Sequence, residues 1–230
     1  MRRIFLDTET TGFGADKHRI VSVGAVAYND RDAIGGESGE FDCYVNPSRA
    51  IDAQARHIHG LSEAFLSGFP TFDGRAQDIA DFIRGAEVVI HNAEFDESFL
   101  NAEFGRLKMP PLADVAAKVV CSLMLARKLH PQLPGHSLDA LCGHFRVDNS
   151  ARVKHGALTD ARLLAQVYLR MTLEQMTFAL PGAKAAAAAE DGGGKVPIIR
   201  ATKAERAAHE SHLDTMREKT KGVIPLWRRK

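Results

Sequence analysis

The stretch Ile4-Phe-Leu-Asp7-Thr-Glu9-Thr-Thr-Gly12 decides the fold of this chain. Three apolar residues lead into two carboxylates separated by one residue, and a turn rich in hydroxyl groups and glycine follows. A short apolar run bounded by turn residues is typical of a strand that is buried on both faces. Because side chains alternate along a strand, we expect Asp7 and Glu9 to project from the same face at its carboxyl end. Two acids held together repel each other, and a divalent cation with oxygen ligands would relieve that repulsion.

The composition is that of a globular protein, with 230 residues of which 45% are hydrophobic and 26% are charged. This length favours one main domain with an appendage. A formal net charge of +1 argues against a basic chromatin-type protein, but an enzyme that holds a few nucleotides through metal ions needs little excess charge. The three cysteines lie far apart without a CxxC motif, and no apolar run approaches membrane-spanning length. We therefore expect a reduced, cytoplasmic protein without a membrane segment.

Beyond the first strand, the pattern predicts strands that come early and then alternate with helices. Runs rich in β-branched residues predict strands over 20–28, 40–45, 87–91 and 118–121, with a hairpin connection over 29–39. Helices are expected over 52–57, 62–66, 72–84, 94–107, 122–130, from 137 onward and over 158–171. Ser122 and Ser137 are the expected N-caps of two of them. This order favours an α/β fold with a mixed sheet flanked by helices.

The composition changes abruptly after Leu180, which suggests three parts of the chain. Residues 1–180 would form the main domain, residues 181–196 a flexible linker rich in alanine and glycine, and residues 197–230 a short C-terminal segment. A capping-box pattern from Thr202 to Glu205 predicts a helix in this last part.

Two further acids, Asp96 and Asp160, lie in predicted helical stretches, so four carboxylates are expected beside buried scaffold. Taken singly, each acid has a plain alternative as a solvated surface group. Together, four carboxylates around one pocket can hold two divalent ions about 4 Å apart, an arrangement suited to phosphodiester hydrolysis. Mg²⁺ or Mn²⁺ fits such ligands. His155 lies five residues before Asp160, and an imidazole, with an ordinary pKa of about 6.5, is suited to taking a proton from the attacking water.

Three segments resemble, in order, the motifs of the DEDDh (DnaQ-like) 3′→5′ exonucleases: Asp7-Thr-Glu-Thr-Thr-Gly12, His91-Asn-Ala-Glu-Phe-Asp96 and His155-Gly-Ala-Leu-Thr-Asp160. Further segments resemble the epsilon-type proofreading subunits of bacterial DNA polymerase III, namely His136-Ser-Leu-Asp-Ala-Leu-Cys142, Ala207-Ala-His-Glu-Ser-His-Leu-Asp214 and Leu226-Trp-Arg228. The resemblance implies a ribonuclease H-like fold and hydrolysis of terminal phosphodiesters at the 3′ end of single-stranded or frayed DNA, by a two-metal mechanism.

The resemblance also implies roles for individual residues. Asp7, Glu9 and Asp160 would hold one divalent ion, and Asp7 would share a second ion with Asp96. His155 would be the general base. Contacts with the terminal nucleotide would come from residues close to these groups, namely Thr10, Thr11, Ile58, His59, Asn92 and Phe95. A structural role remains the alternative for His59, and core packing remains the alternative for Phe95.

The resemblance implies protein partners as well. Leu226 and Trp227 would dock on the alpha (polymerase) subunit, with the linker as a tether. The segment from Gln175 through Phe178 to Leu180 resembles a sliding-clamp-binding peptide, and its plain alternative is the end of the last core helix. Two other functions stay open: a free-standing DEDDh nuclease that trims RNA or DNA 3′ ends, and a non-catalytic scaffold between polymerase and clamp.

Overall fold

Strand β1 (Arg2–Thr10) is the middle strand of a five-stranded sheet with the order β3-β2-β1-β4-β5. The computed structural model describes residues 2–29, 37–150, 152 and 154–179. On one side of β1, strands β2 (Ile20–Asn29) and β3 (Glu37–Tyr44) pair in antiparallel fashion. On the other side, β4 (Glu87–Ile90) and β5 (Lys118–Cys121) run parallel to it. The predicted α/β fold with a mixed sheet is confirmed.

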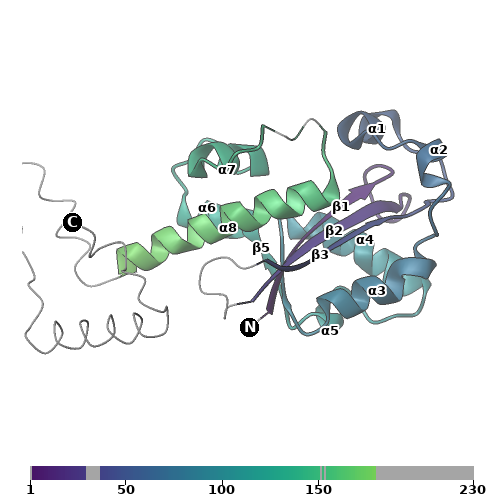
Figure 1. The fold of residues 1–230 in the computed structure, drawn as a ribbon, viewed down its shortest axis with the longest axis horizontal. Helices are drawn as coiled ribbons and strands as arrows, with labels where there is room; N and C mark the ends of the chain where they lie inside the picture. Colours follow the sequence, from purple (N-terminus) through teal and green to yellow (C-terminus); the bar gives the residue numbers. More distant parts are fainter. Residues whose placement is uncertain (1, 30–36, 151, 153, 180–230) are drawn as a thin grey trace, which may run out of the picture. The chain divides into compact units, whose positions relative to one another are not determined.

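Helices flank this sheet, and the long helix α8 crosses one of its faces (Figure 1). The helices of the described residues are α1 (Ala53–His59), α2 (Glu63–Leu66), α3 (Asp73–Ile83), α4 (Ala93–Arg106), α5 (Leu112–Val115), α6 (Ser122–Leu129), α7 (Leu138–Phe145) and α8 (Ala157–Ala179). The sequence did not predict α5, because a single turn is too short to show a helical repeat. Helix α8 also continues past its predicted end at residue 171.

Alternation along β1 divides the interior into two layers. Ile4 and Leu6 pack with apolar side chains of α3 and α4, whereas Phe5 packs with those of α7 and α8, and all three are fully buried. The same alternation places Asp7 and Glu9 on the Phe5 face. The strand continues through Thr10 because its last residues still pair with β2. The two acids therefore lie at the carboxyl end of the strand, as the sequence predicted.

The two serines expected as N-caps have different roles. Ser137 caps α7, since its side chain accepts a hydrogen bond from the backbone N–H of Ala140. The N-cap of α6 is instead Cys121, and Ser122 is the first residue of the helix, so that prediction was wrong. The hydroxyl of Ser122 lies 3.0 Å from Nδ1 of His91, a contact that ties the end of β4 to α6.

Part of the predicted organisation falls outside the described residues. This applies to Leu180, to the linker over 181–196 and to the C-terminal segment over 197–230. Within the described part of the chain, no helix is both long enough and apolar enough to cross a membrane.

Helix α8 approaches the sheet very closely at Gly24 of β2. A Cβ atom at Gly24 would lie 2.0 Å from the backbone nitrogen of Leu158 and 2.2 Å from the carbonyl carbon of Ala157. Gly24 is the register partner of Asp7 on β1. The missing side chain thus lets the first turn of α8, which carries Asp160, lie against the sheet beside Asp7.

We expect Gly24→Ala to lower the free energy of unfolding by about 1–3 kcal/mol, because the added carbon meets backbone atoms that cannot move aside without shifting α8. Gly105→Ala is the matched control: a Cβ there meets nothing within 4 Å, and in a helix alanine is more favourable than glycine by up to about 1 kcal/mol. Urea denaturation of both variants measures the two changes. If Gly24→Ala had the same free energy of unfolding as the wild type, this would contradict the close approach of α8 to β2.

Candidate active site

The four acids singled out in the sequence come from three layers of the fold. Asp7 and Glu9 project from β1, Asp96 lies in the first turn of α4, and Asp160 lies in the first turn of α8. Glu9 is 8% exposed, and Asp96 and Asp160 are each 3% exposed. The charges of Glu9, Asp96 and Asp160 all act on Asp7. The structure therefore brings the four carboxylates into one group, in which Glu9, Asp96 and Asp160 are buried and Asp7 is half-buried.

Asp96 is tied to β1 through Thr8. Its Oδ1 accepts hydrogen bonds from the backbone N–H of Thr8 at 3.0 Å and from the Thr8 hydroxyl at 2.7 Å. These bonds hold the start of α4 against the central strand, on the layer opposite to α8. They leave the second oxygen of Asp96 for other contacts.

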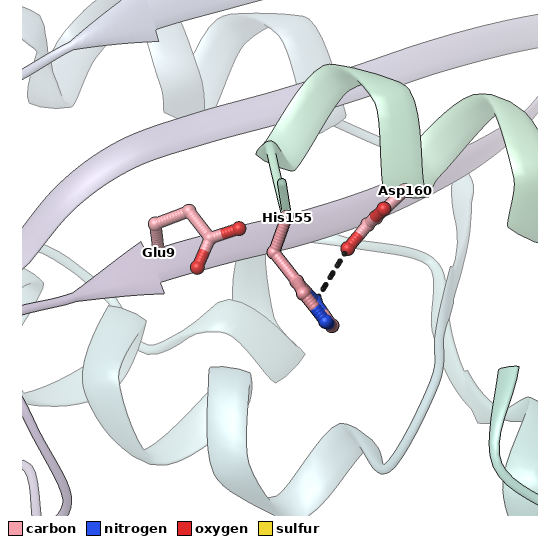
Figure 2. A group of neighbouring side chains, drawn as sticks. All are labelled: Glu9, His155 and Asp160. Atoms are coloured by element: carbon pink, nitrogen blue, oxygen red, sulfur yellow. Dashed lines mark ion pairs between the residues drawn. The ribbon is translucent and has the colours of Figure 1, made fainter. Parts of the chain in front are cut away.

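Glu9, His155 and Asp160 lie close enough to share one ion (Figure 2). One potential ligand atom from each residue lies within 4.8 Å of the other two. His155 belongs to the loop just before α8, and its Nδ1 is 3.2 Å from Oδ2 of Asp160. Its side chain is 46% exposed, so the imidazole stands at the edge of the buried acids.

Two oxygens in this group are buried and have no hydrogen-bond partner among the described residues: Oε1 of Glu9 and Oδ1 of Asp160. A buried acceptor without a partner is costly, and a cation would satisfy it. Carboxylate oxygens are the ligands that Mg²⁺ and Mn²⁺ prefer. The donor set therefore fits a divalent cation of this kind.

Burial and mutual repulsion raise the pKa values of these acids. Burial first, and then the charges of Asp96, Glu9 and Asp160, raise the pKa of Asp7 well above its ordinary value. The pKa of Glu9 rises to about 8 through burial and the charges of Asp160 and Asp96. Burial raises the pKa of Asp96 to about 7, although its bonds from Thr8 oppose the change. Without a cation, the group retains protons that free acids lose.

Two cavities meet at this group. The larger has a volume of about 570 Å³ and is lined by Asp7, Asp160 and His155 together with polar and basic side chains that include Asn92 and Arg127. The smaller has a volume of about 160 Å³, and its lining is mostly apolar. Glu9 lines the smaller cavity, so the carboxylates separate a polar space from an apolar one.

The side chains expected to contact substrate are divided among these places. Four of them line the smaller cavity, namely Thr10, Ile58, His59 and Phe95. Asn92 lines the larger cavity. Thr11 lines neither: it is fully buried, and its hydroxyl lies 3.1 Å from Nδ1 of His18 and accepts a hydrogen bond from the Arg19 N–H.

Sequence reasoning missed two residues at the site. Phe13 is 66% exposed, lines the smaller cavity and contacts the Phe95 ring edge-on with ring centroids 6.1 Å apart. Its position directly after the glycine of the first motif was the available signal. Arg152 donates a hydrogen bond to Oδ2 of Asp160 at 2.5 Å. A single arginine before the last motif has no pattern that would identify it.

The residues expected to bind protein partners lie at or beyond the end of the described chain. Gln175 and Phe178 belong to the last turns of α8. Leu180, Leu226 and Trp227 lie outside the described residues.

The sequence is similar to that of exonucleases and polymerase subunits. The Exonuclease family (RNase T) matches residues 4–168. DNA polymerase III subunit epsilon of Salmonella typhimurium is 43% identical over 242 residues, covering 99% of this chain and 97% of the relative. The subunit of the same name from Escherichia coli is also 43% identical, with the same coverage. Another from Pasteurella multocida is 43% identical over 74% of this chain and 68% of its own length.

The structure is similar to solved exonucleases. Exonuclease X in complex with 5′ overhanging duplex DNA has a TM-score of 0.55 and 25% identity, over 76% of this chain and 92% of the other. The nuclease domain of 3′hExo, a DEDDh family member bound to rAMP, has a TM-score of 0.64 over 75% of this chain and 92% of the other. Its identity is 17%, so this likeness concerns the fold alone.

We expect Glu9→Gln to stabilise the metal-free protein relative to wild type, and to do so more at about pH 8 than at about pH 5. Folding raises the pKa of Glu9 from 4.5 to about 8, so in this window the folded state binds a proton that the unfolded state has lost. The wild type thus loses stability as the pH rises, whereas glutamine has no proton to lose.

Thermal melts in the presence of a chelator at both pH values measure this difference. Glu94→Gln, at an exposed position of α4, is the control and should show no such trend. A stability difference between Glu9→Gln and wild type that stays constant with pH would contradict the raised pKa.

Proposed function

The chain belongs to the exonuclease family and is a 3′→5′ exonuclease of the proofreading, epsilon-subunit type, and we propose that Asp7, Glu9, Asp96, Asp160 and His155 carry out its reaction. The observation that carries this proposal is the convergence of the four acids beside a cavity, with two buried carboxylate oxygens that have no partner among the described residues. Members of the DEDDh family generally use divalent metals, and this donor set suits them.

The acids divide between two ion positions in this proposal. Asp7, Glu9 and Asp160 would hold one divalent ion, and Asp7 and Asp96 would hold a second, with Mg²⁺ or Mn²⁺ as the ion. When bound, such ions supply the positive charge that acidifies the attacking water and stabilises the leaving 3′ oxygen. The pKa values of Asp7 and Glu9 are raised, so these carboxylates retain protons in the metal-free protein. The cations would replace these protons and relieve the repulsion among the acids.

His155 is the proposed general base. It precedes α8 in a loop that contains Gly156, and its half-exposed ring stands beside the larger cavity and close to Glu9 and Asp160. A base must lie within hydrogen-bond reach of the water it deprotonates. The imidazole meets this requirement for a water near the Asp160 carboxylate, and it can pass the proton on to solvent.

The terminal nucleotide would place its base in the smaller cavity, between Ile58, His59 and Phe95. This space is apolar and narrow, so it suits one unstacked base and excludes a paired end. Thr10 lies at its wall, with a hydroxyl that already donates to the Gly12 carbonyl at 2.8 Å. Since the Thr11 hydroxyl contacts His18 and Arg19, we assign Thr11 a structural role in the loop.

The partners are DNA and the polymerase complex for which the epsilon relatives are named. We propose that Leu226 and Trp227 dock on the alpha subunit, and that Gln175, Phe178 and Leu180 bind the sliding clamp. The relatives' similarity covers 99% of the chain and therefore includes the C-terminal segment, which favours this function over a free-standing nuclease. A location in the cytoplasm stays a prediction.

Asp160→Asn should reduce Mg²⁺-dependent release of mononucleotides from single-stranded DNA by about a thousandfold or more, because it removes a charge that both the ion and the base require. The control is Asp114→Asn, which changes an exposed acid of α5 outside both cavities and should retain wild-type activity. Gel analysis of a 3′-to-5′ digestion ladder measures both rates. Comparable activity of the two variants would exclude this role for Asp160.

In the full-length chain, the double variant Leu226→Ala/Trp227→Ala should lose retention of the alpha subunit in a pull-down while it still degrades single-stranded DNA at the wild-type rate. The reason is that an aromatic anchor supplies much of the binding energy of a small interface. Full retention of alpha by the double variant would place the docking site elsewhere.

A further inference from the structure

The guanidinium group of Arg152 joins the last acid of the site to the proposed base. Its Nη2 lies 2.5 Å from Oδ2 of Asp160 and 2.7 Å from Nδ1 of His155. Its Nη1 donates to Oδ1 of Asp139, in the first turn of α7, at 2.5 Å. Asn149 donates to the same Asp139 oxygen at 3.2 Å. One arginine thus holds three groups from different segments.

This guanidinium belongs to the buried part of the site. The side chain of Arg152 is 7% exposed and that of Asp160 is 4% exposed. The positive charge of Arg152 lowers the pKa of Asp7, Glu9 and Asp160, against the effect of burial. Arg152 therefore acts as a counter-ion for the carboxylate group as a whole, in addition to its direct partner.

The contact with His155 bears on the base. A guanidinium has only donors, so it bonds to Nδ1 of His155 in the tautomer in which this nitrogen is the acceptor. A neutral imidazole that accepts at Nδ1 carries its proton on Nε2 and has no second lone pair. In this arrangement, the lone pair that a base would use is already occupied by Arg152.

We propose that Arg152 is a positioning residue that serves as the resident cation of the metal-free site, and that a divalent ion displaces it from Asp160 and thereby frees His155 for the reaction. This inference rests on the proposed function and adds a coupling between ion binding and base availability. Arg152 then acts through Asp160 and His155.

Displacement follows from charge and geometry. An ion that binds Oε1 of Glu9 and Oδ1 of Asp160 shares the Asp160 carboxylate with the guanidinium on Oδ2. Two cations on one carboxylate repel each other strongly at low solvent exposure. The bond to Asp139 uses Nη1, whereas the bond to Asp160 uses Nη2, so Arg152 can keep this anchor when it leaves Asp160.

Mn²⁺ binding to the full-length protein tests the competition. Calorimetric titration should show that Arg152→Gln binds Mn²⁺ about tenfold more tightly than wild type, because no cation has to leave. Arg152→Lys retains the charge and should stay close to wild type. Arg127→Gln is the matched control, since Arg127 lines the same cavity but has no bond to Asp160 or His155 in the described part of the chain. Unchanged or weaker binding by Arg152→Gln, or equal tightening by Arg127→Gln, would overturn the proposal.

The ¹⁵N NMR signals of the His155 ring test the release directly, in the wild type and in Arg152→Gln. In the wild type, saturating Mg²⁺ should move the Nδ1 signal away from its metal-free position, and the signal of metal-free Arg152→Gln should already lie near the released position. A His155→Gln variant assigns the signal. An Nδ1 signal that does not respond to Mg²⁺ would refute the displacement.

The experiments distinguish a failure of this inference from a failure of the proposed function. Wild-type protein that releases mononucleotides with Mg²⁺, but whose Nδ1 signal does not respond, refutes the role of Arg152 and leaves the nuclease in place. Wild-type protein without Mg²⁺-dependent hydrolysis refutes the proposed function itself.

Discussion

Mutual repulsion among buried carboxylates is the constraint on which the active site depends. Asp7 and Glu9 are fixed by a central strand, and Asp96 and Asp160 are held against it by helices from opposite layers. Such a group is stable only if protons, a guanidinium or metal ions neutralise it. Burial and this repulsion together raise the pKa values of Asp7 and Glu9, and the guanidinium of Arg152 lies where it opposes both effects.

The contact at Gly24 shows how the fold creates that constraint. The first turn of α8 lies so near β2 that a single added carbon would meet its backbone. Across the sheet, the bonds from Thr8 draw the start of α4 onto β1. These contacts hold the starts of both helices against the sheet, so the acids they carry have little freedom to move apart.

The sequence was sufficient for most of the fold and for the acids, because both have strong local patterns. Alternation in β1 and three ordered motifs are enough to identify Asp7, Glu9, Asp96 and Asp160. Contacts between segments were not predictable in this way. Arg152 and Phe13 reach the site through tertiary packing. Thr11 has a structural role because its hydroxyl contacts His18, and no sequence pattern indicates this contact. The one-turn helix α5 was not predicted, because it is too short to show a helical repeat of apolar residues.

The origin of the acids in three layers has a consequence for the life of the protein. A partly folded chain that has docked only α4 or only α8 lacks one of the four acids at the sheet, so it cannot assemble the proposed site. We therefore expect a chain in which only one of these two helices has docked to lack nuclease activity.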